Sequence, residues 1–296
     1  QDQTSSYRIL SEFLIRGKQC LRTDLSMLKA TPERRLRGKQ KAPLVTKKKV
    51  SVLKRPASAA SPPTLPTAVV INLQNRSDRW EEVKDRLAAF PGLRYERLEA
   101  VDGRVIDIGL TEVAHTWNTS SNWRYVTKIF EGGTDCGYMQ KVLPLSPGER
   151  GCAASHIHAW RRCVEMGMPL LVLEDDARPT PNFASRLAEA LLHLQEERPS
   201  LLYLGYSKAA PWRRKVSARV AEAEYLWTTV GYVLWPRGAE ILLQSLPVDQ
   251  PVDNFMAKLI SQQTLRGFAV TPAVVKQAKA WNVDNDVAHS DDAAWQ

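Results

Sequence analysis

From residue 68 onward, short apolar runs alternate with stretches of helical periodicity, and this alternation limits the chain to a few architectures. Strands are expected at residues 68–73, 95–101, 170–173, 201–204, 225–235 and 268–275. Helices are expected after the first strand, between residues 146 and 167, and at 183–197, 236–246 and 252–260. Strands and helices that alternate in this way pack as an α/β fold around a largely parallel sheet.

Capping residues mark where two of these helices begin. Ser146, Pro147 and Glu149 place Ser at the N-cap, Pro at the first helical position and Glu at the third, which is a capping box. Ser77 is expected to cap the helix after the first strand. One face of the helix that follows the capping box is expected to carry Ala153, His156, Ile157, Trp160 and Val164. Residues 104–144 are irregular and rich in Trp, Gly, Asn and Thr, which indicates a long functional or covering loop.

The positive charge of the chain is confined to its first part. The net charge is +9 at pH 7, from 41 Lys and Arg against 32 Asp and Glu. Residues 1–67 contain 15 basic and 4 acidic side chains, so the remainder contains 26 and 28. We expect a basic extension over 1–55, partly helical or disordered, a Pro/Ser/Ala linker over 56–67 and one domain over 68–296. Nucleic-acid binding would be a property of the extension at most. The extension is expected to be solvated, and the alternative is that it contacts a membrane surface or a protein partner.

Several other classes of protein are disfavoured by missing signals. No run approaches the roughly 18 apolar residues of a membrane span. Four cysteines are too few for a disulfide framework in a chain of 296 residues. The spacing of Cys152, His156, His158 and Cys163 matches no common zinc site. The chain contains neither a Walker loop nor a GxGxxG motif, which removes the common ATPase and dinucleotide-binding interpretations.

The densest chemical signal is an apolar strand, 170–173, that runs directly into Glu174, Asp175 and Asp176. Adjacent carboxylates at a buried strand end repel one another, and a cation lowers that cost. Ligands in open α/β sheets collect at the carboxyl ends of strands. Alternation along the strand is expected to direct Glu174 and Asp176 to one side and Asp175 to the other. Glu174 and Asp176 would then be a pair of oxygen ligands that suits Mg²⁺ or Mn²⁺. The alternative is a polar strand end with solvated carboxylates.

Polar residues also follow the first strand. Asn72, Arg76 and Arg79 lie on the loop and first helical turn, where two arginines could clamp a phosphate or a nucleoside. The alternative is a surface network between these arginines and Asp78.

Three further groups allow a structural or a functional interpretation. His156 is either a core histidine beside Trp160 or part of a site. Asp253 either caps a helix or acts as a base. The run from Asp284 to Asp292 is either solvated or supplies a metal ligand.

Taken in order, these motifs resemble those of glycosyltransferase family 25, which includes bacterial lipooligosaccharide galactosyltransferases and the procollagen galactosyltransferases. The matching segments span residues 68–292: Val70–Leu73 with Arg76, Asp78, Arg79 and Trp80; Ser146–Glu149 with Gly151, Cys152 and Ser155–Ile157; Leu173–Asp176; Gly231–Leu234 with Gly238–Glu240 and Leu242–Leu243; Pro251–Asp253; and Ser290–Asp291.

The resemblance implies a GT-A-like, Rossmann-type domain that binds a nucleotide sugar, most often UDP-galactose, with Mn²⁺ or Mg²⁺. Glu174, Asp175 and Asp176 would form its DxD-like element, with Asp176, Glu174 and Asp291 toward the metal. Asp253 would be the base of an inverting transfer and would share the catalytic role with Asp176. The residues implied at the nucleotide sugar are Asn72, Arg76, Arg79, Glu149, Ser155, His156, Glu174 and Asp175.

The same resemblance implies transfer of a hexose, with galactose expected, to a hydroxyl of a glycan or protein acceptor. A catalytically silent member that acts as a glycan- or partner-binding scaffold is the alternative. The resemblance does not decide the compartment, which is the secretory pathway or the cytoplasmic side of a bacterial membrane.

Overall fold

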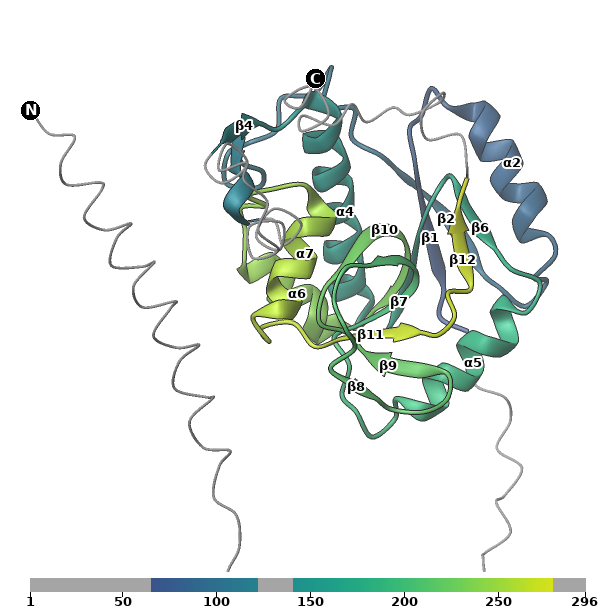
Figure 1. The fold of residues 1–296 in the computed structure, drawn as a ribbon. Coiled ribbons are helices and arrows are strands. Elements are labelled where there is room, and N and C mark those ends of the chain that lie inside the picture. Colours follow the sequence, from purple (N-terminus) through teal and green to yellow (C-terminus); the bar gives the residue numbers. More distant parts are fainter. Residues whose placement is uncertain (1–64, 122–140, 279–296) are drawn as a thin grey trace, which may run out of the picture. The chain divides into compact units, whose positions relative to one another are not determined.

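The computed structural model describes residues 65–121 and 141–278, and its centre is an eight-stranded sheet (Figure 1). The strands lie in the order β2-β1-β5-β10-β7-β11-β9-β8. Their bounds are β1 Ala68–Asn72, β2 Tyr95–Glu99, β5 Leu170–Glu174, β7 Leu201–Lys208, β8 Arg214–Lys215, β9 Val220–Glu222, β10 Leu226–Leu234 and β11 Gly267–Val270.

Most of these strands run in one direction. β1 is parallel to β2 and to β5, and β7 is parallel to β11. β10 lies between β5 and β7 and is antiparallel to both, so β5 and β7 run in the same direction. The sheet is therefore mixed, with most of its strands in one direction, and it confirms the predicted α/β class.

Helices cover both faces of the sheet (Figure 1). α4 Pro147–Met166, α6 Pro236–Gln244 and α7 Val252–Ser261 lie on one face, and α2 Ser77–Leu87 and α5 Phe183–His193 on the other. The alternation of β5 explains this division, because Leu170 and Val172 join the core under α4 while Leu171 and Leu173 join the core under α5. Residue 174 therefore belongs to the α4 face and residue 175 to the α2–α5 face.

Short strands complete the fold and correct two predictions. β3 Thr116–Asn118 pairs with β4 Val142–Pro144, so the segment predicted to be an irregular loop contains a hairpin-like pair. A short 3₁₀ helix, Thr119–Ser121, follows β3. The single strand predicted at 268–275 is wrong: β11 ends at Val270, and β12 Val275–Gln277 pairs instead with β6 Ala177–Pro179. Pro272 lies between β11 and β12 and has no N–H to donate to a ladder.

The capping box of α4 is confirmed, whereas the predicted cap of α2 is wrong. Ser146 Oγ accepts the N–H of Glu149 at 3.1 Å, and Glu149 Oε2 accepts the N–H of Ser146 at 2.8 Å. Gly167, with φ of 62°, ends this helix in the left-handed conformation. Ser77 is the first residue of α2 rather than its cap; the N-cap is Arg76, without a side-chain capping bond.

The buried face of α4 differs from the prediction at one position. Ala153, His156, Ile157 and Trp160 are buried as expected. Val164 is 37% exposed, and Cys163 is fully buried in its place.

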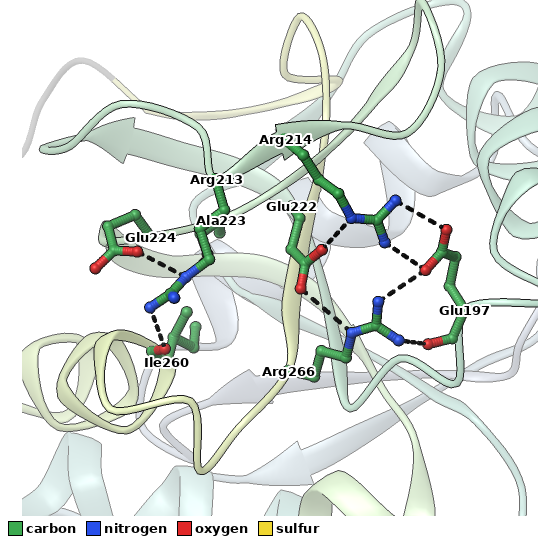
Figure 2. A network of polar contacts seen from close by, with 8 residues as sticks. All are labelled: Glu197, Arg213, Arg214, Glu222, Ala223, Glu224, Ile260 and Arg266. Atoms are coloured by element: carbon green, nitrogen blue, oxygen red, sulfur yellow. Dashed lines mark hydrogen bonds and ion pairs between the residues drawn. The ribbon is translucent and has the colours of Figure 1, made fainter.

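Ion pairs hold the far edge of the sheet together (Figure 2). Glu222 of β9 pairs with Arg214 of β8 at 2.6 Å and with Arg266 at 3.2 Å. Glu197, before β7, pairs with the same two arginines. Next to them, Arg213 pairs with Glu224. An edge strand exposes backbone N–H and C=O groups that could pair with another chain, and charged side chains at the edge disfavour such pairing.

Some predictions lie beyond what the structure describes. The extension 1–55, most of the linker and the acidic run that contains Asp291 fall outside the described residues, so the predicted domain boundary stays a prediction. Among the described helices, none is both long and apolar enough to cross a membrane.

Candidate functional site

A cavity of about 440 Å³ opens where β1 and β5 end, a volume typical of small-molecule sites. The chain crosses from β1 to β2 through α2 on one face of the sheet and reaches β5 through α4 on the other. Such a switch point leaves a crevice at the carboxyl ends of the strands. Eight of the predicted site residues line the cavity: Asn72, Arg79, Glu149, Ser155, Glu174, Asp175, Asp176 and Asp253.

Glu174 points toward α4, as its place in the alternation of β5 requires. Its Oε1 accepts a hydrogen bond from the hydroxyl of Thr229, in β10, at 2.6 Å. His156 Nε2 lies 3.3 Å from the same oxygen. Burial works to raise the pKa of Glu174, but the hydrogen bond and the charge of His156, and then the hydrogen bond from Thr229, outweigh it and hold the pKa below its ordinary value. Glu174 is therefore ionised at neutral pH.

A buried chain of hydrogen bonds orients His156. Trp160 Nε1 donates to the hydroxyl oxygen of Tyr232 at 3.2 Å, and that hydroxyl lies 2.9 Å from His156 Nδ1. The Tyr232 oxygen can accept from Nδ1 as well, so either ring nitrogen of His156 can carry a proton: Nδ1 toward Tyr232 or Nε2 toward Glu174. His156 is fully buried behind the cavity and acts on it through Glu174.

Asp175 points to the opposite face and joins β5 to β1 and α2. It accepts Asn72 Nδ2 at 2.7 Å and Arg79 Nη1 at 3.1 Å. Burial raises its pKa, against the hydrogen bond from Asn72 and the charge of Arg79. The arginine predicted to contact a nucleotide is thus already engaged by a carboxylate at the cavity wall.

Asp176 lies in the turn after β5, beyond the end of strand alternation. Its Oδ1 is buried and has no hydrogen-bond partner among the described residues. Burial, then the charge of Glu174, raises its pKa to about 7, although a hydrogen bond from Gln277 acts in the other direction. A buried carboxylate oxygen without a partner requires an explanation, and a bound cation is one.

Asp253, in the first turn of α7, is held by backbone donors. Its Oδ2 accepts the N–H of Thr228 at 3.1 Å and its Oδ1 accepts the N–H of Asn254 at 2.7 Å. Thr228 has φ of 75°, a rare conformation for a β-branched residue, at an irregular part of the β10–β7 pairing. Thr228 contacts Asp253 and Thr229 contacts Glu174, and neither threonine is predicted from the sequence as a site residue.

The other predicted residues have structural partners. Ser155 Oγ accepts the N–H of Val101 at 2.8 Å and donates to the carbonyl of Gly151 at 2.7 Å, and Glu149 completes the capping box. The Arg76 guanidinium makes two bonds to Asp78, at 2.9 and 3.0 Å, and Arg76 is not among the described residues that line the cavity.

Carboxylates dominate the charge of the cavity. Among the described residues, six carboxylates line it, against two arginines. Each arginine already pairs with a carboxylate: Arg79 with Asp175 at 3.1 Å and Arg104 with Asp102 at 2.8 Å. The charges of the described residues therefore favour an anionic ligand that enters together with a cation.

Comparison with known proteins identifies the family. Residues 66–256 match the family described as glycosyltransferase family 25 (LPS biosynthesis protein). The chain belongs to glycosyltransferase family 25. The resemblance noted from the motifs is thereby confirmed.

Relatives within family 25 include proteins named as active and as inactive. Procollagen galactosyltransferase 1 of Danio rerio is 29% identical over 227 residues, which cover 70% of this chain and 35% of the relative. Inactive glycosyltransferase 25 family member 3 of Homo sapiens is 30% identical over 220 residues, 70% of this chain and 34% of the relative. The chain spans about a third of the length of these curated relatives. Among solved structures, UDP-glucose pyrophosphorylase complexed with UDP-glucose gives a TM-score of 0.36 at 10% identity, over 71% of this chain and 74% of that one.

Proposed function

We propose that the chain is a metal-dependent, inverting glycosyltransferase that moves a hexose, galactose, from a UDP-sugar to a hydroxyl of a glycan or protein acceptor. The observation that carries the proposal is the buried Oδ1 of Asp176, which has no hydrogen-bond partner among the described residues, in a cavity that six of their carboxylates line. Membership of family 25 and the similarity to a procollagen galactosyltransferase supply the reaction class and the sugar.

The residues present fit a divalent cation with oxygen ligands. Asp176 would hold the ion together with Glu174, the last residue of β5, two positions earlier in the chain. The contacts of His156 and Thr229 with the Glu174 carboxylate both end on Oε1, which leaves Oε2 for an ion. Mn²⁺ and Mg²⁺ prefer such carboxylate ligands. When bound, the ion would neutralise the charge that grows on the UDP leaving group. Asp291, which lies outside the described residues, would complete the ligand set.

Asp253 is proposed as the base. An inverting transfer needs a carboxylate that removes the proton of the acceptor hydroxyl as the new bond forms. The two backbone N–H groups that bind Asp253 hold its carboxylate in one orientation at the cavity wall. Asn72 and Arg79 would orient the nucleotide at the opposite wall, where Asp175 fixes them.

A donor screen with Mn²⁺ tests the proposal. Release of free nucleotide would be followed across UDP-, GDP- and CMP-sugars, with and without a chelator, in the wild type and in Asp176→Asn. We expect turnover of UDP-galactose that requires metal and falls at least about 100-fold in Asp176→Asn. The exposed Asp85→Asn is the matched control and should keep full activity. Full activity of Asp176→Asn, or full activity in chelator, would contradict the proposal.

The second candidate function is a silent scaffold that binds a glycan or a protein partner. It is favoured by the 30% identity to relatives named inactive or probably inactive in Homo sapiens and Bos taurus. A scaffold of this kind predicts no nucleotide release from any donor, even where calorimetry detects binding of UDP with Mn²⁺. Metal-dependent release would exclude it.

A further inference from the structure

Cys152, His156 and Glu174 meet at one wall of the cavity. One potential ligand atom from each lies within 4.8 Å of those from the other two. His156 Nε2 and Glu174 Oε1 are 3.3 Å apart. Two bonds of about 2.0 Å to a tetrahedral ion place their ligand atoms at roughly this separation. The pair is therefore spaced as ligands already, and the thiol of Cys152 is close enough to join them.

The surroundings of these three residues are those of a supported metal site. Tyr232 places its hydroxyl 2.9 Å from Nδ1, the ring nitrogen of His156 that would not face an ion. Thr229 bonds Glu174 at 2.6 Å. Metal-bound histidines and carboxylates have such outer partners, which fix the direction of the ligand atom.

Access and charge also favour a cation. Cys152 and Glu174 line the cavity, so an ion could enter from it and keep one position open toward it. The carboxylates of Glu174, Asp253, Glu149 and Asp176 all contribute negative potential at the Cys152 sulfur. Three protein ligands with one open position is the arrangement of catalytic rather than structural zinc sites.

The ligand types decide which ion would bind. A thiolate and an imidazole select Zn²⁺ over Mn²⁺ or Mg²⁺, which prefer oxygen. We propose that Cys152, His156 and Glu174 form a second metal site, selective for ions of the zinc class, that shares Glu174 with the proposed manganese site. On binding, the thiol proton would leave to solvent, and His156 would carry its ring proton on Nδ1, toward the Tyr232 oxygen, so that Nε2 is free for the ion. Because the two sites share Glu174 and two cations beside one carboxylate repel each other, bound Zn²⁺ would weaken the binding of Mn²⁺ and inhibit transfer. The zinc site stands on its own, and only this competition rests on the proposed function.

Titration of the full chain with Co²⁺, a spectroscopic substitute for Zn²⁺, tests the site. We expect a thiolate-to-cobalt charge-transfer band that saturates at one ion per chain and is lost on addition of Zn²⁺. Cys152→Ser should abolish the band while its thermal unfolding matches that of the wild type. Two controls should keep it: Cys163→Ser, whose thiol is buried elsewhere, and His158→Gln, on the exposed side of α4. Absence of the band in the wild type, or its persistence in Cys152→Ser, would overturn the proposal.

Calorimetry separates this proposal from the proposed function. UDP would be titrated with Mn²⁺ into the wild type and into Cys152→Ser, with and without one equivalent of Zn²⁺. We expect Zn²⁺ to weaken UDP binding at least about tenfold in the wild type, an effect of roughly 1.4 kcal/mol, and to have no effect in Cys152→Ser. A cobalt band without any binding of UDP and Mn²⁺ would support the zinc site and refute the proposed function. Unchanged UDP binding with Zn²⁺ bound would refute the competition.

Discussion

At the scale of single residues, Asp176 has the most consequential environment. Its pKa is raised from 3.8 to about 7, chiefly by burial and then by Glu174. A folded-state pKa above the unfolded value means that the ionised carboxylate destabilises the folded protein. The penalty is complete above about pH 7 and disappears as the pH falls toward the unfolded value. A residue kept at a cost in stability is typical of a functional site.

Asp176→Asn should therefore stabilise the metal-free protein. At about pH 8 we expect the Tm to rise by at least about 2 °C, the shift that roughly 1 kcal/mol produces in a domain of this size. The gain should shrink as the pH is lowered toward about 4. Thermal unfolding in chelator measures it, with Asp85→Asn as the control. A lower Tm for Asp176→Asn at about pH 8, or a gain independent of pH, would show that the ionised carboxylate does not destabilise the folded state.

The acidic residues of the site could be predicted from the sequence, whereas their partners could not. Glu174, Asp175 and Asp176 form a local signal, because three carboxylates directly follow an apolar strand. Thr229 and Tyr232 reach Glu174 and His156 only because β10 pairs with β5, more than 50 residues away in the chain. Spacing along the chain contains no information on that pairing.

At the scale of elements, the start of α4 is placed by a close backbone contact. A Cβ atom on Gly151 would lie 2.5 Å from the carbonyl oxygen of Val101 and 2.7 Å from the N–H nitrogen of Gly103. Both neighbours are backbone atoms and cannot rotate away. The contact sets the distance between α4 and the 100–104 loop, and both line the cavity.

Gly151→Ala should separate these two elements. We expect it to lower the free energy of unfolding by about 1–3 kcal/mol, the usual result of forcing a methyl group into a packed region. Binding of UDP with Mn²⁺ should weaken as well. Chemical denaturation and calorimetry measure the two effects. Gly92→Ala is the control, since a Cβ there meets nothing within 4 Å. Equal stability of the two variants would mean that the helix start is free to move.

Elements with strong local signals were predicted, and those defined by distant pairing were not. The capping box and Gly167 fix the ends of α4, and β5 has a clear apolar run. β6, β8, β9 and β12 have only two or three residues each, too few to show a period. The N-cap of α2 is Arg76, one residue before the predicted Ser77. A cap is defined by backbone conformation and by a hydrogen bond from the first turn, and neither can be read from the sequence.

At the scale of the whole molecule, the ion-pair network at the far edge serves stability, away from the cavity (Figure 2). Glu197 and Glu222 each bridge Arg214 and Arg266. The hydrogen bond from Arg214 is the main reason that the pKa of Glu197 lies below its ordinary value. A lowered folded-state pKa stabilises the protein above the unfolded pKa, and this contribution is lost as the pH falls through the folded one.

Glu197→Gln should weaken the fold without affecting the cavity. We expect a loss of about 1 kcal/mol at low salt, reduced at about 1 M salt, because exposed arginines are screened there. The difference from wild type should also fade in acid, below about pH 4. Denaturation at two salt concentrations measures the effect, and the adjacent, exposed Glu196→Gln should be neutral. A loss that high salt leaves unchanged would mean that packing rather than charge is responsible.

Calorimetric titration of UDP into the full chain, with and without Mn²⁺, tests the central claim most directly. The claim is that acidic side chains at the end of β5 seat a cation on which a nucleoside diphosphate depends. We predict binding at one site that is detectable only with Mn²⁺ and is lost in Asp176→Asn. Binding of equal strength in chelator, or in Asp176→Asn with Mn²⁺ present, would contradict the account.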